Sequence, residues 1–236
     1  MSNIVEFVRV SHRYPGGQDV LSEISFSLKQ GEMAFLTGAS GAGKSTLLRL
    51  AAALAKPSRG QLTVNGYRLN DLKPSRVPEF RQRLGLVFQN FNLLQDRSVF
   101  DNVALPLLIR GYAARDIGRY VRAALDHVGL LDREQVFPAF LSGGEQQRVG
   151  IARAVVTKPD LILADEPTGN LDPEMALEVM RIFARFNQVG VSVLIATHAI
   201  DLINRLNYRI LHVEHGHMAG GAPVSVRDLG NTHGPQ

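Results

Sequence analysis

The chain has 236 residues, of which 45% are hydrophobic and 20% are charged, and its formal net charge is +4. This length and composition predict a folded chain of one domain, with or without a subdomain, and exclude wholesale disorder. There is no cysteine, which excludes disulfides, zinc–thiolate sites and cysteine nucleophiles. No apolar run approaches the roughly 18 residues needed to cross a bilayer, and the start lacks the form of a signal peptide. We therefore expect a cytoplasmic protein, and with no dense Lys/Arg block we expect no nucleic-acid partner.

The first ninety residues predict strands on either side of one helix. Apolar positions at 4–10 and 20–28 flank a Pro15-Gly16-Gly17 turn, and Met33–Thr37 predicts a third strand. A glycine-rich loop and a helical run over residues 46–54 follow. Further short strands are expected at 62–64 and 86–88.

The remainder of the chain changes from a helical to an alternating pattern. From about 101 to 158, apolar residues recur at threefold and fourfold spacing, which predicts helices. Apolar runs at 161–164 and 191–196 predict strands buried on both faces of a parallel sheet, with a helix between them. We therefore expect an α/β domain over 1–220, with a core of about 1–89 and 159–220. The predicted helical insertion is about 90–158, and 221–236 is expected to be a C-terminal tail.

Residues 38–45 match the phosphate-binding P-loop pattern between a strand and a helix. Glycines allow backbone N–H groups to approach phosphate oxygens, and the start of a helix at Lys44 favours the same anion. Lys44 is expected to reach the β- and γ-phosphates and the Ser45 hydroxyl to ligate Mg²⁺. The alternative is a glycine-rich turn that resembles the motif by chance. The predicted ATP-binding residues here are Gly38, Ala39, Ser40, Gly41, Ala42, Gly43, Lys44, Ser45 and Thr46.

Two adjacent acids follow the apolar strand at 161–164. Asp165 is placed to hold Mg²⁺, directly or through water, and Glu166 can act as a general base or orient the attacking water. Adjacent acids after a buried strand are costly unless a cation or substrate lies nearby. The alternative is a pair of strand-end acids that face solvent.

A second glycine-rich segment opens another predicted helix, with Ser142 as its N-cap. Its N–H groups would bind an anion. Because the P-loop already holds the terminal phosphates, this segment is expected to serve the nucleotide of another subunit. Its residues are Leu141, Ser142, Gly143, Gly144, Glu145 and Gln146.

Residues 141–146 and the order of these motifs resemble the ATP-binding-cassette (ABC) ATPases over about residues 4–220. The resemblance implies a RecA-like P-loop NTPase core, an antiparallel β subdomain and an inserted α-helical signature subdomain. It implies ATP hydrolysis with Mg²⁺ by a homodimer that forms when ATP is bound, the signature acting in trans. Four residues acquire roles from it: Tyr14 stacks on adenine, Gln89 links the γ-phosphate and Mg²⁺ to the helical subdomain, Asp172 lies at the dimer seam, and His198 contacts the γ-phosphate. Gln89, Glu166 and His198 are then the catalytic set; without the resemblance, Tyr14 and His198 read as ordinary strand and loop residues.

Residues 31–38, 96–104 and 144–156 more closely resemble the bacterial cell-division ATPases of that family. This implies an FtsX-like integral membrane protein as partner, at the cytoplasmic face of the inner membrane, and a role in controlling septal cell-wall hydrolysis. We expect residues 90–97 to meet that partner, with local packing as the alternative. Other functions left open are an export ATPase for lipoprotein release or macrolide efflux, a DNA-repair or chromosome ATPase, and a scaffold that does not hydrolyse ATP.

Overall fold

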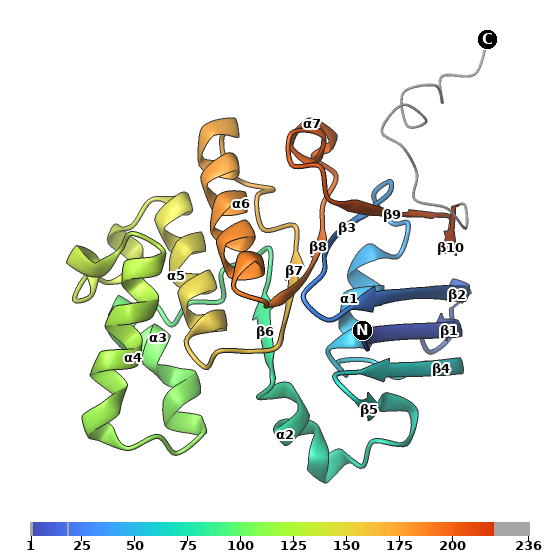
Figure 1. Cartoon of the computed structure of the whole chain (residues 1–236), viewed down its shortest axis with the longest axis horizontal. Coiled ribbons are helices and arrows are strands. Elements are labelled where there is room, and N and C mark those ends of the chain that lie inside the picture. The colour runs from blue at the N-terminus through green and yellow to red at the C-terminus, as the bar shows by residue number, and fades with distance from the viewer. Residues whose placement is uncertain (1, 18, 220–236) are drawn as a thin grey trace.

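The computed structural model describes residues 2–17 and 19–219, so the expected tail at 221–236 lies outside the described residues. A six-stranded sheet runs through the centre of the molecule in the order β10-β9-β3-β8-β7-β6 (Figure 1). Its strands are parallel except for the short β10 at one edge. The strands are β3 (Met33–Thr37), β6 (Leu84–Val87), β7 (Leu161–Asp165), β8 (Ser192–Ala196), β9 (Arg209–Glu214) and β10 (His217–Met218).

The burial of the central strands accounts for their continuous apolar sequences. Every residue of β3 and β8 is buried, as are the first four residues of β7. A parallel sheet is covered on both faces, so its central strands carry apolar residues without alternation. The predicted strands at these positions are confirmed. Because the strands are parallel, the segments that follow β3, β6, β7 and β8 all begin at the same end of the sheet, where the carboxyl ends of these strands lie.

A second, antiparallel sheet has the order β2-β1-β4-β5. One face packs on α1 (Lys44–Ala51), and the two share a core that includes Phe7, Leu62 and Leu47. Figure 1 shows α1 between this sheet and the central one. The strands are β1 (Asn3–Arg13), β2 (Asp19–Lys29), β4 (Arg59–Val64) and β5 (Tyr67–Arg68). The predicted ABC-type fold, with its parallel core and antiparallel sheet, is confirmed.

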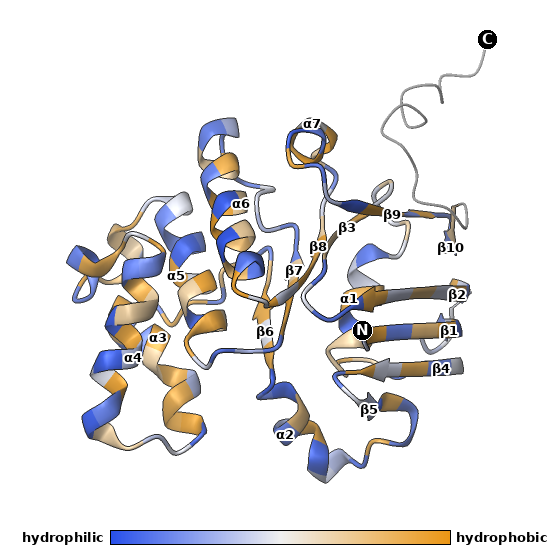
Figure 2. Cartoon of the chain, viewed as in Figure 1, coloured by the Kyte–Doolittle hydropathy of each residue, from blue (hydrophilic) through white to orange (hydrophobic). Residues whose placement is uncertain are grey.

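Three helices occupy the region between β6 and β7: α3 (Val99–Ile109), α4 (Ala114–His127) and α5 (Gly143–Val155). Their apolar faces join α6 (Pro173–Gln188) and one face of the central sheet in a continuous core. In Figure 2 the polar side of α4 faces outward and the central strands are hydrophobic. The remaining α-helices are α2 (Val77–Arg81) and α7 (Ile200–Asn204), and the single 3₁₀ turns are Leu69–Asp71, Pro74–Arg76, Leu131–Arg133 and Pro138–Phe140.

Helix boundaries differ from the predictions where single residues leave the helical conformation. The first helix begins at Lys44, as expected at the phosphate-binding loop, but ends at Ala51, before the predicted position 54. It ends there because Ala53 is left-handed and the N–H groups of the next two residues turn back to the Arg49 carbonyl. The helical pattern of 101–158 is interrupted after α3 and after α4, where Gly111 and Gly129 have positive φ. Glycine adopts that conformation without the steric penalty of a Cβ.

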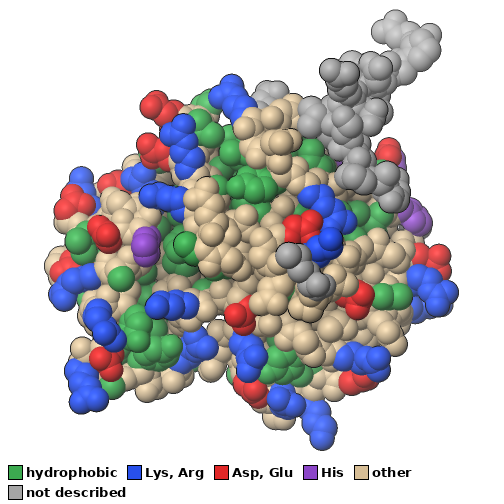
Figure 3. Space-filling model, in the orientation of Figure 1, with side chains coloured by type: hydrophobic (Ala, Val, Ile, Leu, Met, Phe, Trp, Pro, Cys, Tyr) green, Lys and Arg blue, Asp and Glu red, His purple; other side chains and the backbone are tan. Residues whose placement is uncertain are grey.

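Two further features of the described chain are the charge of its surface and the hydropathy of its helices. On the face drawn in Figure 3, basic and acidic side chains are interspersed over the helices and strands. Among residues 2–17 and 19–219, no helix combines the length and the hydropathy that a bilayer crossing requires.

Candidate active site

The loop between β3 and α1 is shaped by its glycines. Gly38 has a φ of 146°, and a Cβ there would collide with the Val213 carbonyl of β9. Gly43, with a φ of 109°, precedes the first residue of α1. The buried Lys44 ammonium donates hydrogen bonds to the carbonyls of Gly38 (2.8 Å) and Ala39 (3.2 Å), so the loop folds over the start of the helix. This is the cradle that a phosphate group requires.

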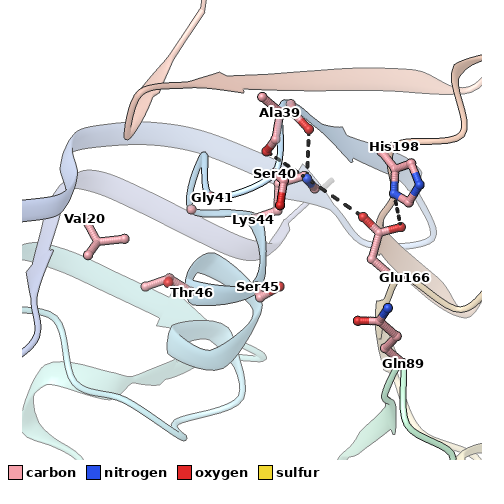
Figure 4. A pocket seen from close by; sticks show the side chains of 12 residues that line it. Val20, Ala39, Ser40, Gly41, Lys44, Ser45, Thr46, Gln89, Glu166 and His198 are labelled. Atoms are coloured by element: carbon pink, nitrogen blue, oxygen red, sulfur yellow. Dashed lines mark hydrogen bonds and ion pairs between the residues drawn. The ribbon is translucent and has the colours of Figure 1, made fainter. Parts of the chain in front are cut away.

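A cavity of about 710 Å³ lies over this loop (Figure 4). Its walls come from the β3–α1 loop, the start of α1 and the segments that follow β6, β7 and β8. Fold topology has therefore brought together residues that are up to 178 positions apart in sequence (198 − 20). The lining residues are Val20, Gly38, Ala39, Ser40, Gly41, Gly43, Lys44, Ser45, Thr46, Gln89, Glu166 and His198. Ala42 was predicted among them but is buried in the core beneath the loop.

Asp165 lies behind Ser45 at the end of β7. The Ser45 hydroxyl donates a 2.9 Å hydrogen bond to the Asp165 carboxylate. Burial raises the pKa of Asp165, and the neighbouring charge of Glu166 raises it further, while the Ser45 hydrogen bond opposes both. A carboxylate that is costly to ionise gains from a nearby cation.

The donor set beside the loop fits Mg²⁺, which prefers hard oxygen ligands and takes few of them from protein. Ser45 and Asp165 offer a hydroxyl and a carboxylate, and Gln89 contributes an amide to the same cavity region. In the described part of the chain, no cluster of three or more His, Asp or Glu side chains could hold a metal alone. Such a site therefore depends on phosphate oxygens and water to complete the coordination.

Glu166, which follows β7, contacts Lys44 in the segment after β3 and His198 in the segment after β8. Its side chain is 13% exposed, with one carboxylate oxygen 3.8 Å from the Lys44 ammonium and the other 2.9 Å from Nδ1 of His198. Figure 4 shows these contacts on one wall of the cavity. Glu166 has a φ of 46°, and its N–H donates to the Ala196 carbonyl of β8. Such left-handed backbone costs on the order of 1 kcal/mol or more and is concentrated at functional sites.

The signature residues lie on a different surface. None of residues 141–146 is among those lining the nucleotide-sized cavity. Ser142 is the N-cap of α5, as predicted: its hydroxyl accepts from the Glu145 N–H (3.3 Å), and the Glu145 carboxylate accepts from the Ser142 N–H (2.8 Å). The hydrogen bonds that the Glu145 carboxylate accepts from the N–H and the hydroxyl of Ser142 lower the pKa of Glu145. Leu141 is buried, whereas Gly143 is exposed at the first turn of α5. Gln146 donates to the Leu141 carbonyl (3.1 Å).

Two further predicted residues do not line the cavity. The Tyr14 hydroxyl is 3.4 Å from the Thr46 hydroxyl. The residue is 38% exposed, and its ring packs edge-on against His12. Asp172 caps the N-terminus of α6 by accepting from the N–H groups of Glu174 and Met175. Its carboxylate therefore has a role in the fold of the chain as well as any at a dimer seam.

The segment expected to meet a membrane partner packs in part within its own chain. Leu93 is buried and Phe91 packs against the core, which corrects their expected exposure, whereas Leu94 is 42% exposed. Sequence analysis missed two residues around this site. Val20 lines the cavity, and Arg153 binds the backbone of the segment after Gln89. Neither carries a motif, because both act through tertiary contacts.

Comparison with known proteins identifies the family to which this chain belongs. The ABC transporter family profile matches residues 21–169. The chain therefore belongs to the ABC transporter family and is an ABC-type ATPase, which hydrolyses ATP. It is 54% identical over 218 residues to the cell division ATP-binding protein FtsE of Escherichia coli K12, covering 92% of this chain and 98% of that protein. It is 41% identical to FtsE of Bacillus subtilis, covering 90% and 93%. Within its family the chain is thus one of the FtsE cell division ATP-binding proteins.

A solved structure agrees with the assignment to the ABC family. The ATP-binding cassette MJ0796, described as a dimer in a post-hydrolysis state bound to ADP and Pi, superposes with a TM-score of 0.83 at 32% identity. The match covers 92% of this chain and 97% of that one. The expectation of a cell-division ATP-binding protein of the ABC ATPase type is confirmed.

Proposed function

We propose that two copies of this chain close around ATP, and that this closure drives a membrane partner in cell division. The observation that carries the proposal is the separation of two anion-binding surfaces. The phosphate loop lines the cavity with Gln89, Glu166 and His198, whereas the exposed start of α5 lies outside it. A head-to-tail pair with twofold symmetry would set the α5 start of one copy against the cavity of the other.

Within each cavity the residues divide the chemistry of hydrolysis. The loop N–H groups and Lys44 bind the β- and γ-phosphates, and Tyr14 offers an exposed ring face to the adenine. Glu166 orients the attacking water or accepts its proton while the bond between the γ-phosphorus and the bridging oxygen breaks. His198 holds the Glu166 carboxylate and contacts the γ-phosphate, with Gln89 on the adjacent wall.

Mg²⁺ would be held by Ser45, Gln89 and Asp165 together with the substrate. When bound, it neutralises charge on the phosphate oxygens. The second copy contributes Ser142, Gly143 and Gly144, and Asp172 lies at the seam. Loss of the γ-phosphate removes the group that both copies hold, so the pair opens.

The proposed partner is an FtsX-like integral membrane protein, which holds the chain at the cytoplasmic face of the inner membrane. The complex would couple ATP-driven closure to septal cell-wall hydrolysis. The support is the identity to FtsE proteins and the exposed Leu94 in the segment after Gln89. Purification of the full chain from membranes with and without ATP checks this. An FtsX-like protein should be recovered with the wild type and reduced by Leu94→Asp, and equal recovery would reject this contact surface.

The dimer is tested with a change that the monomer tolerates. A Cβ at Gly143 would approach nothing closer than 4.0 Å, and an acid in the first turn of a helix is favourable for the fold. Gly143→Asp should therefore melt within about 2 °C of the wild type, yet repel the triphosphate of the second copy. In a Glu166→Gln background, which retains ATP, light scattering should show a dimer that Gly143→Asp abolishes.

The matched control is Gly118→Asp, in the interior of α4. There the new carboxylate would meet the Arg122 guanidinium one turn later, so the fold accepts it and the dimer should form. Equal dimerisation of the two variants would reject the arrangement in trans.

A further inference from the structure

The backbone that follows Gln89 is held by an arginine of the signature helix. Arg153, near the end of α5, donates from its two terminal nitrogens to the carbonyls of Phe91 and Asn92, both at 2.7 Å. Asn92 is left-handed, with a φ of 48°, which turns the two carbonyls toward the guanidinium. Two short parallel hydrogen bonds from one rigid fork fix both the position and the orientation of this segment.

Arg153 has no other obvious task in the fold. Burial lowers the pKa of its guanidinium, and within the described residues it forms no ion pair. A partly buried cation without an acidic partner is costly unless hydrogen bonds compensate it. Here the compensation comes from backbone carbonyls two and three residues after Gln89. Within the described residues, the hydrogen bonds of the Arg153 side chain are thus made to these two carbonyls.

The same segment touches the other end of α5. A Cβ at Gly143 would lie 4.0 Å from the tip of the Phe91 ring, so this ring borders the signature glycine. Further along, the buried Asn102 of α3 accepts from the Leu94 N–H and donates to the Leu94 carbonyl. The path from Gln89 to α3 therefore lies along α5 and is anchored at both ends.

We propose that Arg153 is a positioning residue that sets Gln89 in the cavity according to the position of the signature helix. The proposal rests on the proposed function, in which Gln89 faces the γ-phosphate and the signature belongs to the opposite site. A shift of α5 on closure of the dimer would be transmitted through the Arg153 fork to the Phe91 and Asn92 carbonyls, and so to Gln89. Closure of the dimer at one nucleotide site would then change the position of Gln89 at the other.

The test compares two substitutions of Arg153 in the full-length chain with one control. Arg153→Lys keeps the charge but loses the fork, and Arg153→Gln keeps a donor without the charge. Each should lower kcat for ATP about tenfold and leave KM within about twofold, because the phosphate loop is untouched. Arg110→Lys is the control, since Arg110 is another partly buried arginine that donates to a backbone carbonyl, that of Thr157, away from Gln89. Its kcat should match the wild type.

A double-mutant cycle with Gln89→Ala separates positioning from general destabilisation. If Arg153 acts through Gln89, adding Arg153→Lys or Arg153→Gln to Gln89→Ala should lower kcat no further. An independent tenfold loss in the double variant would overturn the inference. Failure of both Arg153 variants to fold would also overturn it, because the residue would then serve stability. Wild-type turnover of Gln89→Ala alone would instead reject the role of Gln89 in the proposed function.

Discussion

At the residue scale, Asp165 shows how a site prepared for a cation shapes the stability of the chain. Its pKa is raised in the fold, chiefly by burial, so the folded state binds this proton more tightly than the unfolded chain does. The stabilisation from the protonated form is complete below the unfolded pKa and is lost as pH rises through the folded pKa. At neutral pH the ionised carboxylate therefore opposes folding unless a cation is bound.

Asp165→Asn removes this charge and keeps an oxygen that can accept from Ser45. Without nucleotide or Mg²⁺, we expect the variant to melt about 2 °C or more above the wild type near pH 7. The difference should shrink toward about pH 4, and Mg-ATP should stabilise the variant less than the wild type. Thermal melts across pH check this, with the exposed Asp132→Asn as control. A melting temperature for Asp165→Asn below that of the wild type at neutral pH would contradict the inference that the ionised Asp165 carboxylate opposes folding.

Single residues also mark the limit of sequence reasoning. Lys44, Ser45 and Asp165 could be predicted because their roles depend on neighbours in sequence, a strand before and a helix after. Leu93 could not, because its burial depends on helices that come later in the chain. The contact between Arg153 and Phe91 spans 62 positions and follows no local pattern.

At the element scale, α3 is tied to the segment before it by one side chain. Asn102 is fully buried, and its amide donates to the carbonyls of Leu94, Arg97 and Ser98 and accepts from the Leu94 N–H. Buried backbone groups that lose such a partner cost about 1–3 kcal/mol each. The segment between Gln89 and α3 thus depends on this residue for its shape.

We expect Asn102→Ala to lower the free energy of unfolding by about 3 kcal/mol, measured by urea denaturation. Ser98→Ala, which removes the N-cap of the same helix, should cost only about 1 kcal/mol. A loss below about 0.5 kcal/mol for Asn102→Ala would mean that water replaces its hydrogen bonds.

Elements differ in how far their sequence determines them. The buried strands β3, β7 and β8 were predicted nearly to the residue, because a continuous apolar run bounded by polar residues admits few other structures. The helical region was predicted in type but not in its breaks. Its ends depend on which glycines adopt positive φ, and Gly111 and Gly129 do so while Gly118 continues a helix.

At the scale of the whole molecule, two cores share the central sheet. One lies between it and the helices α3 to α6, and the other between it, α1 and the antiparallel sheet. Phe35 of β3 belongs to the first core and Leu36 to the second, so adjacent residues of one strand face opposite layers. The cavity over the phosphate loop is lined by residues that follow the strands β3, β6, β7 and β8 of this shared sheet.

The helical region and the rest of the chain thus pack on a common sheet, and the signature remains outside the cavity of its own chain. In the proposed arrangement, a second copy completes the site. The division of the chain into a core of about 1–89 and 159–220 and an insertion of about 90–158 stays a prediction.

Mixing two inactive variants tests the shared site most directly. Lys44→Ala removes the ammonium from the phosphate loop, and Gly143→Asp blocks the signature, so each protein alone should lack ATPase activity. A mixed dimer joins the intact loop of one chain to the intact signature of the other. Because neither variant should close around ATP with a copy of itself, the dimers that form are mixed and each has one intact site of two, so equal amounts should recover up to about half of wild-type activity. No recovery above the separate variants would show that loop and signature act within a single chain, and would contradict the account.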